Sequence, residues 1–137
     1  MTVVAARTLP PLDDDNREFW TGGATGQLRL PFCAACSRWI FPPLLLCPGC
    51  RSPAIYAAVS GKGRIFTYTV NHHPFNPEVT VPYVIAIVEL VEQEGLRFTT
   101  DIVNCPIDSV RIDLPVRVIF EQQRDVFVPL FEPDAEA

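Results

Sequence analysis

The chain has 137 residues, of which 48% are hydrophobic, so it is long enough to bury a core as one domain or as two small fused modules. Its formal net charge of −5 disfavours nucleic-acid partners, because an acidic surface repels phosphate backbones. No apolar run approaches the roughly 18 residues of a membrane-spanning helix, and residues 1–9 lack the long apolar core of a secretory signal. The sequence therefore predicts a cytoplasmic protein with reduced thiols, and its 14 prolines disfavour long helices.

Residues 1–26 are expected to form an N-terminal arm followed by one short helix. The side chains of Asp13 to Asp15 can cap exposed amide groups and suit the positive end of a helix dipole, so the helix is predicted to run from about Asp13 to Thr21. Phe19 and Trp20 are large apolar residues for so short a polar helix. They either dock the helix on its own domain or contact a partner subunit, and the sequence leaves both interpretations open.

Two C-x-x-C pairs, separated by ten residues, dominate residues 27–59. A two-residue gap lets the chain turn back so that both sulfur atoms point at one ion, and four thiolates make the closed tetrahedral shell that structural zinc prefers. The spacing predicts a rubredoxin-like zinc ribbon with the metal ligands Cys33, Cys36, Cys47 and Cys50. Disulfides are disfavoured because nothing indicates an oxidising compartment, and a redox-active pair would need a helix that starts at the motif. Rubredoxin-type iron stays open as the occupant.

The arm between the two cysteine pairs is unusually apolar. Trp39 to Leu46 reads Trp-Ile-Phe-Pro-Pro-Leu-Leu-Leu, whereas a zinc ribbon has almost no core of its own in which to bury such residues. The arm is expected either to fold back on the neighbouring domain or to form a patch that binds a partner, and the sequence does not choose between these alternatives.

Residues 60–137 have the pattern of a β domain. Short alternating or apolar segments follow one another, joined by tight turns and one longer loop, and no helix is expected among them. These features predict about five strands in a small closed barrel of the OB (oligomer-binding) type, because closure removes the edges that an open sheet would expose. The segments expected as strands are Arg64–His72, Tyr83–Val91, Leu96–Val103, Val110–Ile112, Val116–Glu121 and Asp125–Val128.

Few residues of the barrel are candidates for chemistry. Phe66 and Tyr68 alternate on one predicted strand. They can fill the barrel, stack on the adenine ring of coenzyme A or stack on nucleic-acid bases, and the acidic composition favours these roles in that order. His72 and Cys105 have no visible partner that would activate them, so structural roles are favoured and no catalytic residue is predicted.

Several short motifs also follow one another in a set order, namely Phe19-Trp20-x-Gly22, Gly26-x-Leu28, the cysteine pairs with Phe41-Pro42-Pro43 between them, Gly61-x-Gly63-x-Ile65-x-Thr67-Tyr68-Thr69-Val70, Pro82-Tyr83 and Leu114-Pro115-Val116-x-Val118. In this order and spacing they resemble the acyl-CoA-associated zinc-ribbon/OB-fold family, long described only as a domain of unknown function. The resemblance extends from about Asp13 to Pro133. Ser37 and Arg51 stand where the family usually carries a glycine near the second cysteine of each pair.

The resemblance implies an accessory subunit rather than an independent enzyme. Members of the family are small partners of thiolase-superfamily proteins, so the expected partner is a thiolase-like or lipid-transfer-protein-like subunit in a hetero-oligomer. That partner would act on a CoA thioester, by carbon–carbon bond cleavage of the retro-aldol type, as in steroid side-chain degradation, or by acyl transfer. This chain would stabilise the partner and contribute to acyl-CoA binding or channelling. The alternatives are a nucleic-acid-binding zinc-ribbon/OB protein and a self-sufficient hydrolase that uses His72 or Cys105.

Overall fold

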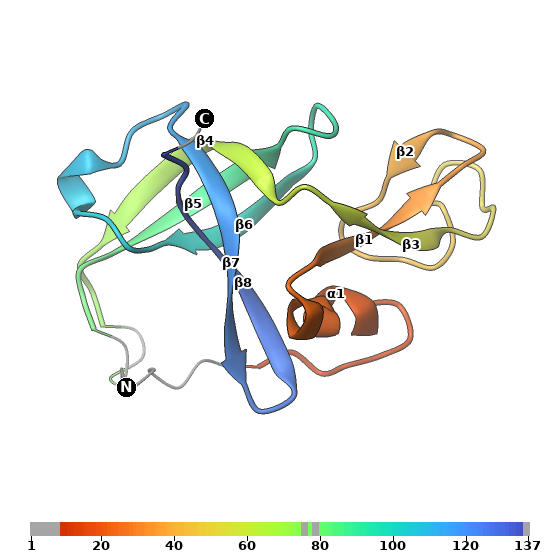
Figure 1. Cartoon of the computed structure of the whole chain (residues 1–137), viewed down its shortest axis with the longest axis horizontal. Helices are drawn as coiled ribbons and strands as arrows, with labels where there is room; N and C mark the ends of the chain where they lie inside the picture. The colour runs from red at the N-terminus through yellow and green to blue at the C-terminus, as the bar shows by residue number, and fades with distance from the viewer. Residues whose placement is uncertain (1–8, 75–76, 78–79, 136–137) are drawn as a thin grey trace.

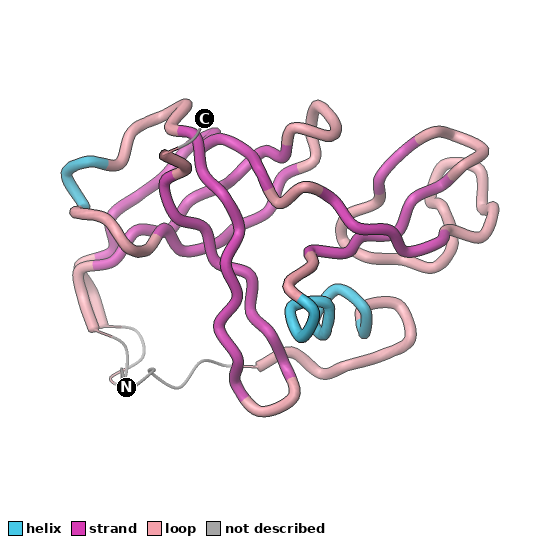
Figure 2. The backbone as a smooth tube through the Cα atoms, in the orientation of Figure 1, coloured by secondary structure: helices cyan, strands magenta, loops and turns pink. Residues whose placement is uncertain are grey.

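The computed structural model describes residues 9–74, 77 and 80–135, and its regular structure is almost entirely β (Figures 1 and 2). A short helix, a three-stranded sheet and a closed five-stranded barrel follow one another along the chain. The mainly β fold predicted from the sequence is therefore confirmed. Within the described residues, no helix has the length and apolar character needed to cross a membrane.

The N-terminal helix, α1 (Arg17–Thr21), is shorter than predicted and leads directly into a 3-10 turn, η1 (Gly22–Thr25). The predicted start at Asp13 is wrong. The Asn16 amide donates to Asp13 Oδ1 over 2.8 Å, and the Asp13 amide donates to Asn16 Oδ1 over 2.9 Å. These reciprocal hydrogen bonds hold the acidic run in a turn that ends at Asn16, directly before α1, so the run precedes the helix instead of forming its first turn.

The ribbon is an antiparallel sheet with the strand order β2-β1-β3. Its central strand, β1 (Leu28–Cys33), pairs with β2 (Arg38–Trp39) beside the first cysteine pair and with β3 (Ile55–Val59) over most of its length. Leu28 and Leu30 of β1 are almost completely buried and belong to the same core as the barrel residues. The ribbon is therefore packed against the barrel rather than tethered to it.

The barrel has the strand order β4-β5-β6-β8-β7 and is closed by pairing between β7 and β4. Its antiparallel pairs place apolar side chains of alternate positions inside, and β6 and β8 meet in parallel at Ile102 and Phe131. The predicted five-stranded OB-type barrel is confirmed. The strands are β4 (Lys62–Asn71), β5 (Tyr83–Leu90), β6 (Arg97–Ile102), β7 (Pro115–Gln123) and β8 (Val126–Pro133).

Two of the predicted strands differ from the structure. Val110 to Ile112 forms no strand, because a 3-10 turn, η2 (Ile107–Ser109), ends there with the Val110 amide donating to the Ile107 carbonyl over 3.1 Å. The last strand continues to Pro133 instead of ending at Val128, because β7 and β8 pair throughout as one long hairpin. Figure 1 shows the turn of this hairpin extending beyond the rest of the barrel, beside α1.

One apolar core runs through all three parts of the molecule. The ring of Phe41 from the ribbon arm lies 5.4 Å from Phe19 of α1 and 4.7 Å from Phe98 of β6, between ring centroids. Phe98 in turn lies 6.0 Å from Phe131 of β8. Phe19, Phe98 and Phe131 are buried. Phe19 therefore docks the helix on its own domain, and Phe41 fixes the ribbon to the barrel.

Candidate functional site

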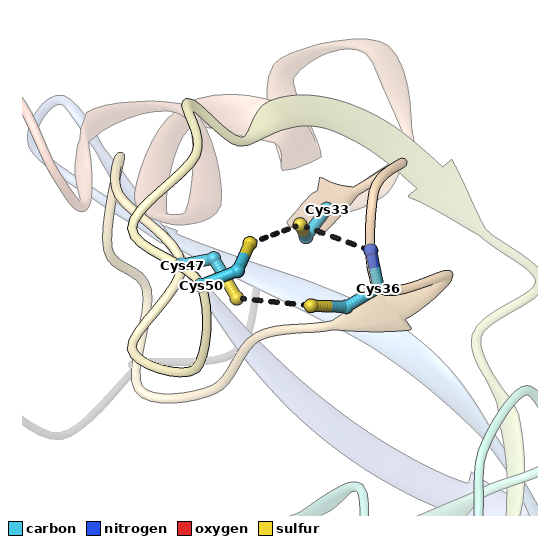
Figure 3. Close-up of side chains that lie close together, drawn as sticks. All are labelled: Cys33, Cys36, Cys47 and Cys50. Atoms are coloured by element: carbon cyan, nitrogen blue, oxygen red, sulfur yellow. Dashed lines mark hydrogen bonds between the residues drawn. The ribbon is translucent and has the colours of Figure 1, made fainter.

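The four cysteines of the ribbon meet at one point (Figure 3). Their sulfur atoms all lie within 4.8 Å of one another, with 3.6 Å between the Sγ atoms of Cys33 and Cys50 and 3.9 Å between those of Cys36 and Cys47. A tetrahedral ion with Zn–S bonds of about 2.3 Å has S···S edges of about 3.8 Å. The spacing is far too long for disulfides, and the donor set fits a four-thiolate structural zinc site.

Backbone amides inside both turns point at sulfur atoms. The Cys36 amide donates to Cys33 Sγ, and the Gly49 amide donates to Cys47 Sγ, each over 3.4 Å. Such hydrogen bonds stabilise a thiolate over a thiol. The first bond appears as a dashed line in Figure 3, where the turn between Cys33 and Cys36 directs both side chains toward the cluster.

Cys50 and Cys36 have pKa values that are shifted in opposite directions. Hydrogen bonds from the Ser52 side chain and amide lower the pKa of Cys50 to about 6. Hydrogen bonds among the clustered thiols, led by the one with Cys50, raise the pKa of Cys36 to about 12. The cluster therefore does not hold four negative charges at neutral pH by itself, whereas a divalent cation at its centre would stabilise all four thiolates.

Two non-glycine residues complete the turns in a left-handed conformation. Ser37 has φ of 52° and Arg51 has φ of 63°, and each directly follows the second cysteine of a pair. Glycine adopts this conformation without steric cost, whereas other residues are destabilised by roughly 1–2 kcal/mol. Ser37 and Arg51 therefore hold, at some cost, the left-handed conformation that a glycine would adopt freely.

The first half of the ribbon arm is packed against the molecule. Ile40 is buried with Cys33 and Cys47 in the small core of the ribbon. Trp39 is half-buried, and its backbone amide and carbonyl bond to the side chain of Gln93 over 2.8 Å and 3.2 Å. For this half of the arm, folding back on the neighbouring domain is the correct alternative.

The second half of the arm is exposed. Leu44, Leu45 and Leu46 have 40%, 37% and 57% of their surface exposed. Leu46 forms a β-bridge with Pro53, two residues before Ile55, which is the most exposed large apolar residue of the described chain at 77%. We call Leu44, Leu45, Leu46 and Ile55 the ribbon patch.

A cleft of about 520 Å³ lies where α1, the ribbon arm and the barrel meet. Thr99, Thr100 and Asp101 of β6 supply polar groups on one side. Trp20 is half-buried and faces this cleft, so it is neither a core residue nor fully exposed. The apolar walls come from Phe19, Trp20, Phe41, Tyr83, Ile85, Phe98, Val128, Pro129 and Leu130.

Comparison with known proteins identifies the family. Residues 20–55 match the model of the ChsH2 rubredoxin-like zinc ribbon domain, and residues 56–121 match that of the ChsH2 C-terminal OB-fold domain. The chain is 32% identical to a chain of the solved Ltp2-ChsH2(DUF35) aldolase, with a TM-score of 0.80, over 91% of this chain and 98% of that one. This chain belongs to the DUF35 family. The predicted family is thereby confirmed.

Two curated relatives of this DUF35 chain differ in size. It is 40% identical over 96 residues to a DUF35 domain-containing scaffold protein of Methanothermobacter thermautotrophicus, covering 68% of this chain and 71% of that protein. It is 33% identical over 129 residues to the 3-oxo-4,17-pregnadiene-20-carboxyl-CoA hydratase alpha subunit of Mycobacterium tuberculosis, covering 94% of this chain and 41% of that protein. The chain thus spans about two fifths of the length of the curated hydratase subunits it matches.

The DUF35 barrel exposes both aromatic residues singled out from the sequence. Phe66 and Tyr68 have 43% and 37% of their surface exposed, so the expectation that they fill the barrel is wrong. Ile65, directly before Phe66, is completely buried, so Phe66 points outward, and the register of β4 with β5 shifts at this position, between Ile65 and Thr67. The guanidinium of Arg97 lies over the Phe66 ring, with Cζ 3.8 Å from the ring centroid.

A charged cluster beside Phe66 escaped the sequence analysis. Glu89 is only 7% exposed, and its carboxylate accepts hydrogen bonds from the Gly95 amide and Arg97 Nε, both over 3.0 Å, and from Arg64 Nη2 over 3.4 Å. The Gly95 bond and then the Arg97 bond hold the pKa of Glu89 below its usual range, against the opposing effect of desolvation. A signal was present, because Glu89 interrupts an otherwise apolar strand.

The two candidate catalytic residues lie in different settings. His72 is exposed just after β4, and Cys105 is half-buried against the main core. Cys105 thus has the surroundings of a small apolar residue. That neither residue is catalytic stays a prediction.

Proposed function

We propose that this chain is an accessory subunit of an acyl-CoA-processing complex whose reaction is carried out by a thiolase-like or lipid-transfer-protein-like partner. The reaction would be carbon–carbon bond cleavage of the retro-aldol type, or acyl transfer. The match to nearly the whole of a chain from the Ltp2-ChsH2(DUF35) aldolase supports this role. The similarity to a subunit named for a pregnadiene-carboxyl-CoA supports a steroid-like acyl group as the substrate class.

The observation that carries the accessory role is the ribbon patch. Its four residues have 37–77% of their surface exposed, although the same short arm also buries Ile40. Clustered exposed apolar side chains of this kind mark protein interaction sites. The patch is also held in a fixed place, because the Leu45 amide donates to Asp15 Oδ1 over 2.8 Å and Phe41 packs into the core. A rigid apolar surface loses little entropy when a partner covers it.

The metal would stabilise the structure around the ribbon patch rather than take part in a reaction. A zinc ion held by Cys33, Cys36, Cys47 and Cys50 would hold together the two turns between which the arm runs. Four protein ligands fill a tetrahedral shell, which suits a structural ion. The zinc therefore stabilises the conformation that presents the ribbon patch.

The cluster around Phe66 is our candidate for the nucleotide end of CoA. Arg64 and Arg97 have 60% and 41% of their side-chain surface exposed, so both guanidinium groups can still reach a ligand. Arginine recognises phosphate through paired hydrogen bonds, and exposed aromatic rings such as Phe66 and Tyr68 can stack on a purine. The Glu89 carboxylate accepts a hydrogen bond from each arginine and so holds both guanidinium groups in place.

The partner surface can be tested with a matched pair of substitutions. The chain is co-expressed with the thiolase-like protein encoded nearest to it, and the mixture is analysed by size-exclusion chromatography. Leu46→Asp should abolish co-elution, because it places a charge in a desolvated interface. Ile112→Asp is the control, because Ile112 in the β6–β7 connection is as exposed as Leu46, at 58% against 57%. Co-elution of both variants at the level of the unmutated chain would refute the ribbon patch as the interface.

The alternative of a nucleic-acid-binding protein predicts a different result. With a net charge of −5, the chain should bind single-stranded oligonucleotides no more tightly than non-specific proteins do, with Kd weaker than roughly 10 µM at physiological salt. Submicromolar, salt-sensitive binding would instead favour the alternative.

A further inference from the structure

The cleft beside Trp20 exists because two strands of the barrel separate. β8 stays paired with β7 along its whole length. β6, in contrast, pairs with β8 at one position, where Ile102 lies opposite Phe131. Beyond that point the hairpin leaves the barrel and packs against α1, as Figure 1 shows. Thr100 Oγ donates to the Pro129 carbonyl over 3.1 Å and links the two sides of the gap.

The walls of the cleft are fixed by the main core. Trp20 stands edge-on to buried Phe19 at 4.8 Å, and Phe41 lies 4.7 Å from Phe98, between ring centroids. Both rings are therefore anchored on one side while they face the cleft on the other. A cavity whose walls are already packed needs no reorganisation to receive a ligand.

The size and lining of the cleft indicate a class of ligand. Its volume of about 520 Å³ lies within the 300–1,000 Å³ that is typical of sites for drug-sized molecules. Among the described residues that line it there is no lysine, arginine or histidine, and the ionisable ones are Asp101 and Tyr83. Such a site repels phosphate and carboxylate groups and favours an uncharged apolar body with few polar atoms.

The position of the cleft on the barrel also supports a ligand-binding role. It lies partly on the outer face of β5 and β6, the second and third strands of the barrel, which is the face that OB folds use for ligands. Arg97, Thr99 and Asp101 are alternate residues of β6 and so point to this same face. At about 3.3 Å per residue, Arg97 and Asp101 are roughly 13 Å apart along the strand.

We propose that this cleft binds the apolar acyl group of the CoA thioester, with the nucleotide end of the molecule lying toward Arg97 and Phe66. The identification of the ligand as an acyl group rests on the proposed function, whereas the apolar site itself rests on the geometry of the cleft. This assigns part of substrate recognition to the accessory chain.

The fluorescence of Trp20 can report directly on ligand binding in the cleft. The chain has two tryptophans, so Trp39→Phe leaves Trp20 as the single reporter, and Trp39 does not line the cleft. Progesterone, an uncharged apolar molecule of drug size, should shift the Trp20 emission saturably, with one site per chain by equilibrium dialysis. Coenzyme A without an acyl group should leave the emission unchanged. Absence of saturable progesterone binding would overturn the proposal.

Two further variants locate the binding. Thr99→Phe narrows the cleft and should weaken progesterone binding at least tenfold, whereas Thr67→Phe, on neighbouring β4 and outside the cleft, should not. Equal affinity in both variants would contradict the assignment. Displacement of progesterone by the thiolase-like partner at equal stoichiometry would show that the cleft is a protein contact, and the proposal would be wrong. Complex formation without progesterone binding would refute this inference and leave the proposed function standing.

Discussion

Glu89 holds Arg97 in place on the surface of the barrel: Arg97 Nε donates to Glu89 Oε2 over 3.0 Å, from the adjacent strand. The carboxylate is almost buried, while the guanidinium lies over the exposed ring of Phe66. The arginine is therefore ordered without being covered. An ordered, exposed guanidinium loses less entropy on binding a phosphate than a mobile one does.

This arrangement predicts that Arg97 contributes to CoA affinity. Arg97→Ala should weaken the binding of CoA to the isolated chain at least about tenfold, because a hydrogen bond to a charged group is worth about 1.5–3 kcal/mol. Isothermal titration calorimetry measures the change. Arg124→Ala, which removes an exposed arginine from the β7–β8 turn, should have no effect. Equal losses of CoA affinity in the two variants would show that only the net charge of the chain affects binding, and would contradict this role of Arg97.

The lowered pKa of Glu89 makes stability depend on pH in acid. Since the folded chain holds this pKa below its ordinary value of 4.5, the stabilisation is fully present above about pH 4.5 and is lost as pH falls through the folded pKa. Glu89→Gln should therefore lower Tm at pH 7, and the Tm difference from the unmutated chain should shrink between pH 4.5 and 3. Any loss of zinc in acid affects both proteins alike. A difference that stays constant over this range would contradict the role of Glu89.

The clustering of the four cysteines could be predicted because its determinants are local. Within each pair the two-residue gap itself creates the turn whose amide reaches the sulfur, as the bond from Cys36 to Cys33 shows. The barrel strands could be predicted for a similar reason, since alternation of apolar residues reflects one buried face. Pairing of Tyr83 to Leu90 with both neighbours confirms this.

The surface features for which we propose ligands could not be predicted, because they depend on contacts between distant segments. Phe66 and Tyr68 alternate in the sequence, but alternation alone does not say which face of a strand points inward, and buried Ile65 shows that the opposite face of β4 does so. The cleft needs Trp20, Phe41 and Val128 at the same place, which only the packing of α1 and the hairpin produces. The start of α1 differs from the prediction because of a local contact. The side chains of Asp13 and Asn16 each accept a hydrogen bond from the other residue's backbone amide ahead of the helix.

Removing one zinc ligand should unfold the ribbon. Metal binding at four-cysteine sites contributes on the order of 10 kcal/mol of folding energy, so Cys36→Ser should lose the metal and either lower Tm or abolish soluble expression. Cys105→Ser is the control, because Cys105 lies outside the cluster and should keep one zinc per chain. Elemental analysis that finds neither zinc nor iron in the unmutated chain, purified without chelators, would contradict the assignment.

The left-handed residue after the second cysteine pair gives a test of the turn geometry. Arg51→Gly should be neutral or stabilising, because the relief of roughly 1–2 kcal/mol of backbone strain is partly offset by the larger entropy of unfolded glycine. Arg51→Val should be destabilising by more than about 1 kcal/mol, because a β-branched residue fits a φ of 63° poorly. Denaturant unfolding of the zinc-loaded proteins compares them. Equal stability of the two variants would show that the turn is not constrained as described.

The most direct test of the accessory role is the turnover of an acyl-CoA substrate by the chain alone, by its thiolase-like partner alone and by the co-purified pair. A steroid side-chain aldol-CoA thioester is the substrate of choice, with products followed by liquid chromatography. The account predicts a stable complex on size-exclusion chromatography, a silent isolated chain and turnover by the pair that exceeds that of the partner alone. Turnover by the isolated chain, lost on His72→Ala or Cys105→Ala, or failure of the unmutated pair to co-elute, would contradict it.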